Sequence, residues 1–162
     1  MTSDNFLDKY FWIIMILAIS IQGIVMRYQA RKYIKENPDL RKGYDDFLKG
    51  WLFIMNAPYL VIGFGILSGL SQSIWDIFDW ESGNPITIAF ICSVMLLYLM
   101  GINWIYLRGG AIFFEKHPGL YNTISMSRSP YTTSKRVKIE YFFMYVLLPL
   151  VGLGFYFYVN SL

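Results

Sequence analysis

The sequence has very few of the side chains that hold metals and cofactors. Its 162 residues include one cysteine, Cys92, and one histidine, His117. A lone cysteine cannot form an intrachain disulfide. One Cys and one His are also too few for a zinc site with several such ligands, or for haem held by two histidines. We therefore expect no metal and no cofactor, and the sequence offers no set of catalytic residues.

Charged residues are also scarce. They make up 15% of the chain, and hydrophobic residues make up 56%, whereas soluble domains carry about 25% charged residues. The deficit is concentrated in four uncharged runs, which are residues 10–26, 51–73, 85–107 and 141–162. A helix needs about 20 residues to cross a hydrocarbon core of about 30 Å, and all four runs approach or exceed that length.

These runs predict an all-α integral membrane protein with four transmembrane helices. A bilayer admits only helices or closed barrels, and the runs lack the alternating pattern of barrel strands. We place the spans at about residues 10–28, 51–70, 86–107 and 141–159, in a single membrane domain covering residues 1–162. The uncharged runs contain no ionisable residue of the kinds that mark proton relays, which argues against a proton-coupled transporter.

The cations lie almost entirely in two connecting segments. Of the 14 Lys and Arg residues, all but Lys9 lie between Arg27 and Lys49 or between Arg108 and Lys138. Cytoplasmic loops of membrane proteins carry an excess of Lys and Arg. We therefore expect loops 29–50 and 108–140 in the cytoplasm and both termini outside, which in a bacterium means the inner membrane. This topology accounts for the positive charge without a nucleic-acid partner.

Local signals refine the boundaries of these spans. The first helix is expected to continue past the membrane through Ile34, and Asn37-Pro38 reads as the cap and first turn of a new helix. Apolar residues between Leu40 and Trp51 have helical spacing and could lie at the membrane surface. Residues 71–84 mix aromatic and acidic side chains, which suggests a short helix or turn at the outer interface.

The two halves of the chain resemble each other. Residues 34–40 (IKENPDL) match residues 114–120 (FEKHPGL) at an offset of 80 positions. In the second and fourth spans a proline is followed by a Gly-x-Gly pair, at Pro58, Gly63 and Gly65 and at Pro149, Gly152 and Gly154. Two tandem parallel helical hairpins, related by an axis along the membrane normal, would give this pattern. Coincidence is the alternative.

Four polar residues lie at similar depths in the predicted spans, namely Gln22, Asn56, Asn103 and Tyr145. At 1.5 Å per residue, each lies roughly 6–8 Å inside the cytoplasmic boundary. One interpretation is a layer of interhelical hydrogen bonds, each worth about 0.6 kcal/mol or somewhat more. The other is a cytoplasm-facing polar vestibule that binds a small ligand or ion.

Proline and glycine mark expected bends and contacts. Pro58 and Pro149 each remove a backbone donor, so we expect kinks in the second and fourth spans. Small residues let helices approach closely, within the chain or between subunits. The expected packing positions are Gly63, Gly65, Gly69, Gly152 and Gly154.

Basic residues next to the spans are expected to contact anionic lipid headgroups, at about 1 kcal/mol per charge. They are Arg31, Lys32, Lys35, Lys135, Arg136 and Lys138. Glu140 is expected to pair with one of the last three. His117, beside Glu115, could serve as an acid or base, but the internal match to Asn37 favours a helix-capping role.

These observations favour a structural or interaction subunit of a membrane homo-oligomer or larger complex. Tight-packing motifs and basic loops suit that role. The alternative is a small oligomeric channel or transporter that uses the polar vestibule. A membrane enzyme that uses His117 and cytoplasmic acids is a third hypothesis.

Overall fold

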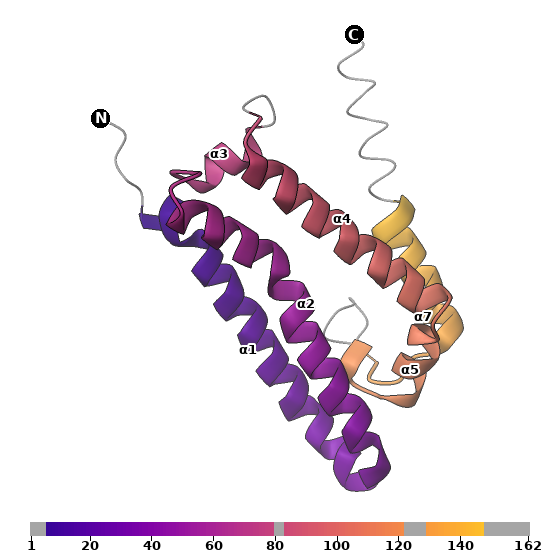
Figure 1. Ribbon diagram of the computed structural model, residues 1–162. Coiled ribbons are helices and arrows are strands. Elements are labelled where there is room, and N and C mark those ends of the chain that lie inside the picture. The colour runs from indigo at the N-terminus through magenta and orange to yellow at the C-terminus, as the bar shows by residue number, and fades with distance from the viewer. Residues whose placement is uncertain (1–5, 80–82, 122–128, 148–162) are drawn as a thin grey trace. The chain divides into compact units, whose positions relative to one another are not determined.

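The computed structural model describes residues 6–79, 83–121 and 129–147 (Figure 1). Within these ranges the chain is helical and has no strand, as predicted. The elements are α1 (Phe6–Glu36), the 3-10 helix η1 (Pro38–Leu40), α2 (Arg41–Leu67), α3 (Ile74–Phe78), α4 (Pro85–Tyr106), α5 (Gly110–Lys116), α7 (Ser134–Phe142) and the π-helical turn η3 (Phe143–Leu147). Internal contacts group the chain into two compact units, residues 1–99 (unit 1) and 100–162 (unit 2).

Three helical segments are long and apolar enough to cross a membrane: α1, η1 with α2, and α4. The 22 residues of α4 extend about 33 Å at 1.5 Å per residue, close to the hydrocarbon thickness of about 30 Å. This length and composition are compatible with an integral membrane protein. The fourth predicted span begins in α7 and η3, and the rest of it lies outside the described residues, so four spans remain a prediction.

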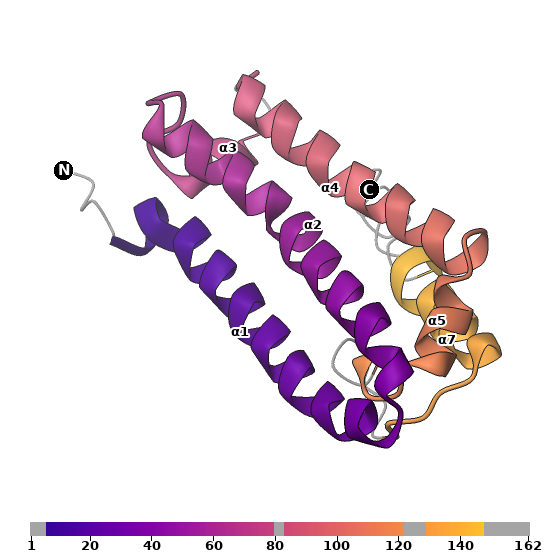
Figure 2. The same cartoon turned by 60° about the horizontal axis from the view of Figure 1, so that its bottom comes forward.

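The first two helices form an antiparallel hairpin, and Figures 1 and 2 both show them side by side. As predicted, α1 continues past the apolar run and ends at Glu36. Pro38 then opens η1, and the Oδ1 atom of Asn37 accepts a hydrogen bond from the backbone N–H of Asp39 at 3.3 Å. The cap satisfies an otherwise unpaired donor, and proline at this position needs no donor. The sequence signal for the turn is therefore confirmed.

The charged end of the hairpin is packed as a helix pair. The amphipathic segment predicted between Leu40 and Trp51 forms the start of α2, and Tyr44 and Leu48 are buried there. Met26 and Ala30 of α1 are also buried. An ion pair joins Arg27 Nη2 to Asp45 Oδ1 at 3.3 Å. This pair is partly exposed and contributes little to stability, so apolar burial provides most of the packing energy.

Two glycines bring α1 and α2 close together. A Cβ atom on Gly63 of α2 would lie 2.7 Å from Cε3 of Trp12 on α1. A Cβ atom on Gly23 of α1 would lie 3.0 Å from Cδ2 of Leu52 on α2. Each glycine therefore receives a large side chain from the facing helix. Close approach at small residues increases the van der Waals contact that holds helices together in lipid.

The opposite end of unit 1 has a small apolar core. It contains five buried isoleucines from α2, α3 and α4, which are Ile62, Ile66, Ile74, Ile77 and Ile86. The short helix predicted within residues 71–84 is α3, and a capping box between Ser73 and Asp76 begins it. The Ser73 backbone N–H donates to Asp76 Oδ2 at 3.0 Å. This cap fixes a five-residue helix that would be too short to persist alone.

α2 bends along its length, as Figures 1 and 2 both show. Pro58 lies inside this helix and is buried. Proline has no N–H for the carbonyl of Ile54, and its ring crowds that carbonyl, so a bend is expected there. The side chain of Asn56 also bonds the carbonyl four residues earlier, which favours bending further. Pro149, the other predicted kink, lies outside the described residues.

Unit 2 is held by aromatic and polar contacts between α4, α5 and α7. The Tyr106 hydroxyl on α4 donates to the Lys138 carbonyl of α7 at 2.7 Å. A Cβ atom on Gly110 would lie 2.6 Å from Cδ2 of Trp104, so only glycine lets α5 begin against this indole. Arg136 Nε lies 2.6 Å from Glu140 Oε1, which confirms the ion pair predicted for that carboxylate.

The contact at Gly63 gives a direct test of the hairpin. Gly63→Ala should lower the stability of the folded chain by about 1–3 kcal/mol, because the new methyl group overlaps the Trp12 ring. Gly50→Ala is the matched control, since a Cβ atom there has nothing within 4 Å, and it should stabilise α2 by about 0.5–1 kcal/mol. The measurement is the thermal unfolding midpoint of the purified protein. Equal midpoints for the two variants would contradict the contact.

Candidate functional site

The four predicted polar residues fall into different surroundings. In unit 1, Gln22 of α1 and Asn56 of α2 are half-buried. In unit 2, Asn103 of α4 and Tyr145 of η3 are exposed, and the Tyr145 ring stacks on Tyr141 with centroids 4.4 Å apart. The common polar layer therefore stays a prediction, and its members differ in how much of each side chain faces outward.

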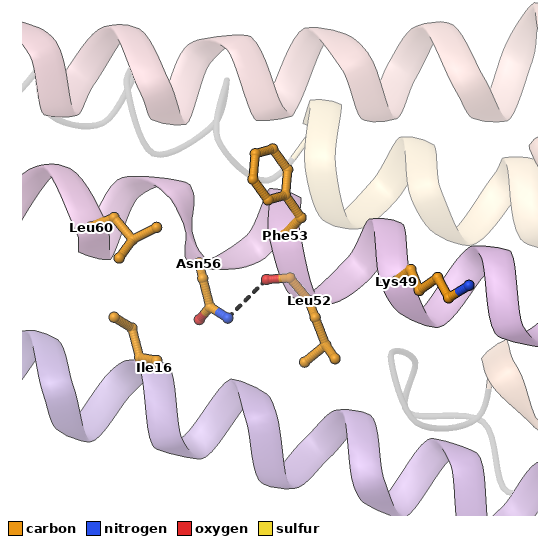
Figure 3. Close-up of a pocket in the computed structure, with 6 residues that line it drawn as sticks. All are labelled: Ile16, Lys49, Leu52, Phe53, Asn56 and Leu60. Carbon is orange, nitrogen blue, oxygen red and sulfur yellow. Dashed lines mark hydrogen bonds between the residues drawn. The ribbon is translucent and has the colours of Figure 1, made fainter.

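Asn56 lies beside a groove of about 430 Å³ along α2 (Figure 3). Its Nδ2 donates to the Leu52 carbonyl at 2.8 Å. The other carboxamide atom, Oδ1, is buried without a hydrogen-bond partner among the described residues. The groove is lined by Ile16, Lys49, Leu52, Phe53, Asn56 and Leu60. Apart from Asn56, its walls are apolar, and Lys49 supplies a charge at one end (Figure 3).

Asn103 points outward from α4. Its side chain is exposed and makes no hydrogen bond within the part of the chain that the structure describes. On a helix, positions 92, 96, 99 and 103 fall on one face, because eleven residues are about three turns. Cys92, Leu96 and Leu99 are exposed as well. An amide thus lies at the end of an exposed apolar stripe, which we call the α4 stripe (Cys92, Leu96, Leu99 and Asn103).

The predicted packing glycines have distinct roles. Gly63 meets Trp12, and a Cβ atom on Gly65 would lie 2.6 Å from Cγ2 of Ile86 on α4. Gly69 follows the end of α2 with φ of 75°, and a Cβ atom there would meet nothing within 4 Å. The Gly65–Gly69 pair therefore combines one helix contact with one turn that needs a left-handed residue. Gly152 and Gly154 lie outside the described residues.

The two matched heptapeptides end their helices in a similar way. Asn37 has φ −142° and ψ 94°, and His117 has φ −118° and ψ 81°. The backbone N–H of each donates to a carbonyl four residues earlier, at 2.9 Å for Asn37 and 3.0 Å for His117. The internal repeat itself stays a prediction, because this likeness covers one turn in each half.

The side chains at these two positions act in opposite directions. Asn37 bonds forward to Asp39, whereas the Nδ1 atom of His117 lies 2.8 Å from the Phe113 carbonyl behind it. The imidazole also stacks on the Phe113 ring, with centroids 3.9 Å apart. The side chain of His117 therefore caps the end of α5.

A buried phenol adjoins the ion pair of unit 2. Tyr121 is buried, and burial is the main cause that raises the pKa of its hydroxyl, with the negative charge and hydrogen bond of Glu140 adding to it. Glu140 in turn pairs with Arg136. A phenol held in its protonated form donates a hydrogen bond and does not act as a base. This cluster therefore has a structural role in joining the helical residue Tyr121 to α7.

Most of the residues predicted to contact lipid headgroups are exposed. These are Arg31, Lys32, Lys35, Lys135 and Arg136, while Lys138 is half-buried. The Arg31 guanidinium lies 5.8 Å from the centroid of the Tyr28 ring. Exposure leaves the charges accessible, and their contact with lipid stays a prediction. The roles of Gly23 and Ile16 could not be predicted from the sequence, because neither residue belongs to a motif and their contacts depend on the facing helix.

His117 should make stability depend on pH. Burial is the main cause that lowers its pKa below 6.5; Lys116 lowers it further, and the bond to Phe113 opposes both. The unfolded chain therefore takes up this proton first as the pH falls through 6.5, so the folded state loses stability below that pH. Between pH 7.5 and 5, the thermal unfolding midpoint should fall more for the native protein than for His117→Asn. Parallel falls would exclude the effect.

Comparisons with known proteins returned no relative. No family model, curated protein or solved structure matches the chain.

Proposed function

We propose that this protein is a structural or interaction subunit of a membrane homo-oligomer or larger membrane complex, embedded through α1, α2, α4 and a fourth span. The observation that carries the proposal is the outward-facing carboxamide of Asn103 on the α4 stripe.

Little of α4 is buried within the part of the chain that the structure describes. Only 11% of its most apolar 18-residue window is buried, and Ile88, Met95 and Leu99 are each more than half exposed. Lipid can cover these apolar side chains at no cost. It cannot satisfy a carboxamide, because an unpaired polar group in hydrocarbon costs several kcal/mol.

A second copy of the chain can satisfy Asn103 directly. A carboxamide has both a donor and an acceptor, so two asparagines related by a twofold axis can bond each other. Such bonds between membrane helices contribute roughly 0.6–2 kcal/mol each. The α4 stripe would then be the contact surface, with Leu96 and Leu99 packing between the paired asparagines and the cysteines.

The native Cys92 allows the proposed interface to be tested by disulfide cross-linking, with no cysteine introduced. Oxidation in native membranes should link two chains through Cys92, and Cys92→Ser should remove the cross-linked dimer. Asn103→Leu should reduce cross-linking at least threefold, because it removes the bond that aligns the two stripes. Asn37→Leu is the matched control, since Asn37 lies at the α1–η1 turn, and it should leave cross-linking unchanged. A detergent-resolved strict monomer that never cross-links would overturn the proposal.

The alternative function is a small oligomeric channel or transporter with a cytoplasm-facing polar vestibule. The observation that favours it is the buried, unpartnered Oδ1 of Asn56, with Gln22 on the facing helix α1. Vesicles containing the oligomer separate the two functions. Ion flux that Asn56→Leu alters would support the channel, and an oligomer without flux would support the interaction subunit.

We also propose the topology that the charges favour, with basic loops 29–50 and 108–140 in the cytoplasm and both termini outside. The α1–α2 hairpin supports the placement of loop 29–50 on the side opposite α3. α1 and α2 run antiparallel, so the basic turn at η1 lies at one end and α3, with Asp76, lies at the other. Positive charge is retained on the cytoplasmic side during insertion.

Single cysteines introduced at the two ends of the hairpin test the topology. In a Cys92→Ser background, an impermeant maleimide applied to intact cells should label Gln72→Cys and leave Lys42→Cys unlabelled. Both native residues are exposed, so access to the reagent depends on the side of the membrane. Lysed cells should show labelling at both positions. If only Lys42→Cys were labelled in intact cells, the proposed orientation would be wrong and the basic loops would lie outside.

A further inference from the structure

The groove beside Asn56 follows one stripe of α2. Lys49, Phe53, Asn56 and Leu60 are spaced by three or four residues, so they lie on one side of the helix, and Ile16 of α1 faces them. Phe53 and Leu60 are 78% and 51% exposed. Figure 3 shows these residues in order along the helix, with Lys49 at one end and Leu60 at the other.

The charge at the Lys49 end has no partner within the described residues. Two carboxylates precede Lys49 in helical spacing. Asp45 is taken by Arg27 at 3.3 Å and by Arg41 at 3.9 Å, and Asp46 forms no ion pair within the described residues. Lys49 is exposed and forms no ion pair in the described part of the chain. The same end of the hairpin carries six further cations between Arg27 and Lys42, which raises the local attraction for an anion.

The length of the groove corresponds to one leaflet. Lys49 lies just before the uncharged run, and Leu60 is eleven residues further along α2. That separation is about 16 Å along the helix axis, and half of the hydrocarbon core is about 15 Å. A ligand that fits must therefore have an anionic group at the membrane surface and an apolar chain that reaches the middle of the bilayer.

We propose that this groove binds one anionic phospholipid of the leaflet next to the basic loops. The Lys49 ammonium pairs with the lipid phosphate. One acyl chain lies along Phe53 and Leu60, against Ile16. The carboxamide of Asn56 remains bonded to the Leu52 carbonyl and takes no part. The site requires α1 and α2 to lie in a bilayer, as proposed above, but it does not require an oligomer.

Charge complementarity favours this occupant over a second copy of the chain. The uncharged runs of a second copy could fill the apolar part of the groove, but they carry no acidic side chain for Lys49, whereas one anionic lipid supplies both parts. A zwitterionic lipid fills the apolar part equally well, but its own cation opposes Lys49. The preference for a net negative headgroup is therefore the signature of the site.

Native mass spectrometry of the full chain measures this preference. The probes are phosphatidylglycerol and phosphatidylcholine with identical acyl chains. The protein should bind one molecule of phosphatidylglycerol, and this binding should be tighter than that of phosphatidylcholine. Lys49→Gln should weaken it about fivefold, which corresponds to about 1 kcal/mol for a charge at the surface. Lys49→Arg should retain binding. Leu60→Trp should weaken both lipids, because the indole fills the apolar part of the groove.

Two controls separate this site from general attraction to the basic hairpin and from the dimer contact on α4. Lys42→Gln removes an exposed cation on the same hairpin but outside the groove, so it should change binding less than twofold. Asn103→Leu lies on α4, outside the groove, and should leave lipid binding unchanged, whereas the proposed oligomer requires it to reduce cross-linking. Equal losses for Lys42→Gln and Lys49→Gln, or no preference between the two lipids, would overturn the proposal. The proposal would also be overturned if Leu60→Trp abolished a dimer and left lipid binding unchanged.

Discussion

The close approach of α1 and α2 at Gly23 and Gly63 determines where the other features of unit 1 lie. Because Leu52 and Trp12 fill the space above these two glycines, the register of the hairpin is fixed at two levels. That register places Ile16 opposite the stripe of α2 that forms the groove. In lipid no hydrophobic effect drives helices together, so van der Waals contact at small residues has to supply the association.

Asn56 and Asn103 each place a polar carboxamide in an apolar helix, and their hydrogen bonding differs. Asn56 donates to a carbonyl of its own helix and leaves one oxygen buried without a partner in the described structure. It therefore costs some stability and favours a bend next to Pro58. Asn103 is exposed in the described structure, and in the proposed oligomer its carboxamide would bond a second copy. A carboxamide turned inward shapes its own helix, and one turned outward is accessible to a partner.

Local signals predicted much of the fold but little of the site. The end of α1, the cap at Asn37 and the helix α3 follow from residues adjacent in sequence, and these predictions are confirmed. The direction in which a side chain faces is not a local property. It depends on the rotation of each helix against its neighbours, so the sequence could not tell that Asn103 is exposed. For the same reason the sequence predicts packing roles for both Gly65 and Gly69, although one contacts Ile86 and the other ends a helix.

Because α1 continues beyond its apolar run, the basic residues of the hairpin lie at different distances from the end of that run. From Met26 to Lys35 the helix rises about 13 Å, whereas electrostatic interactions decay over about 8 Å at physiological ionic strength. For a hairpin standing along the membrane normal in the proposed topology, Lys49 would feel the headgroup charge, and Lys35 would be largely screened from it. The extension would then act as a spacer, with its base at the membrane surface and its positively charged tip in the aqueous phase.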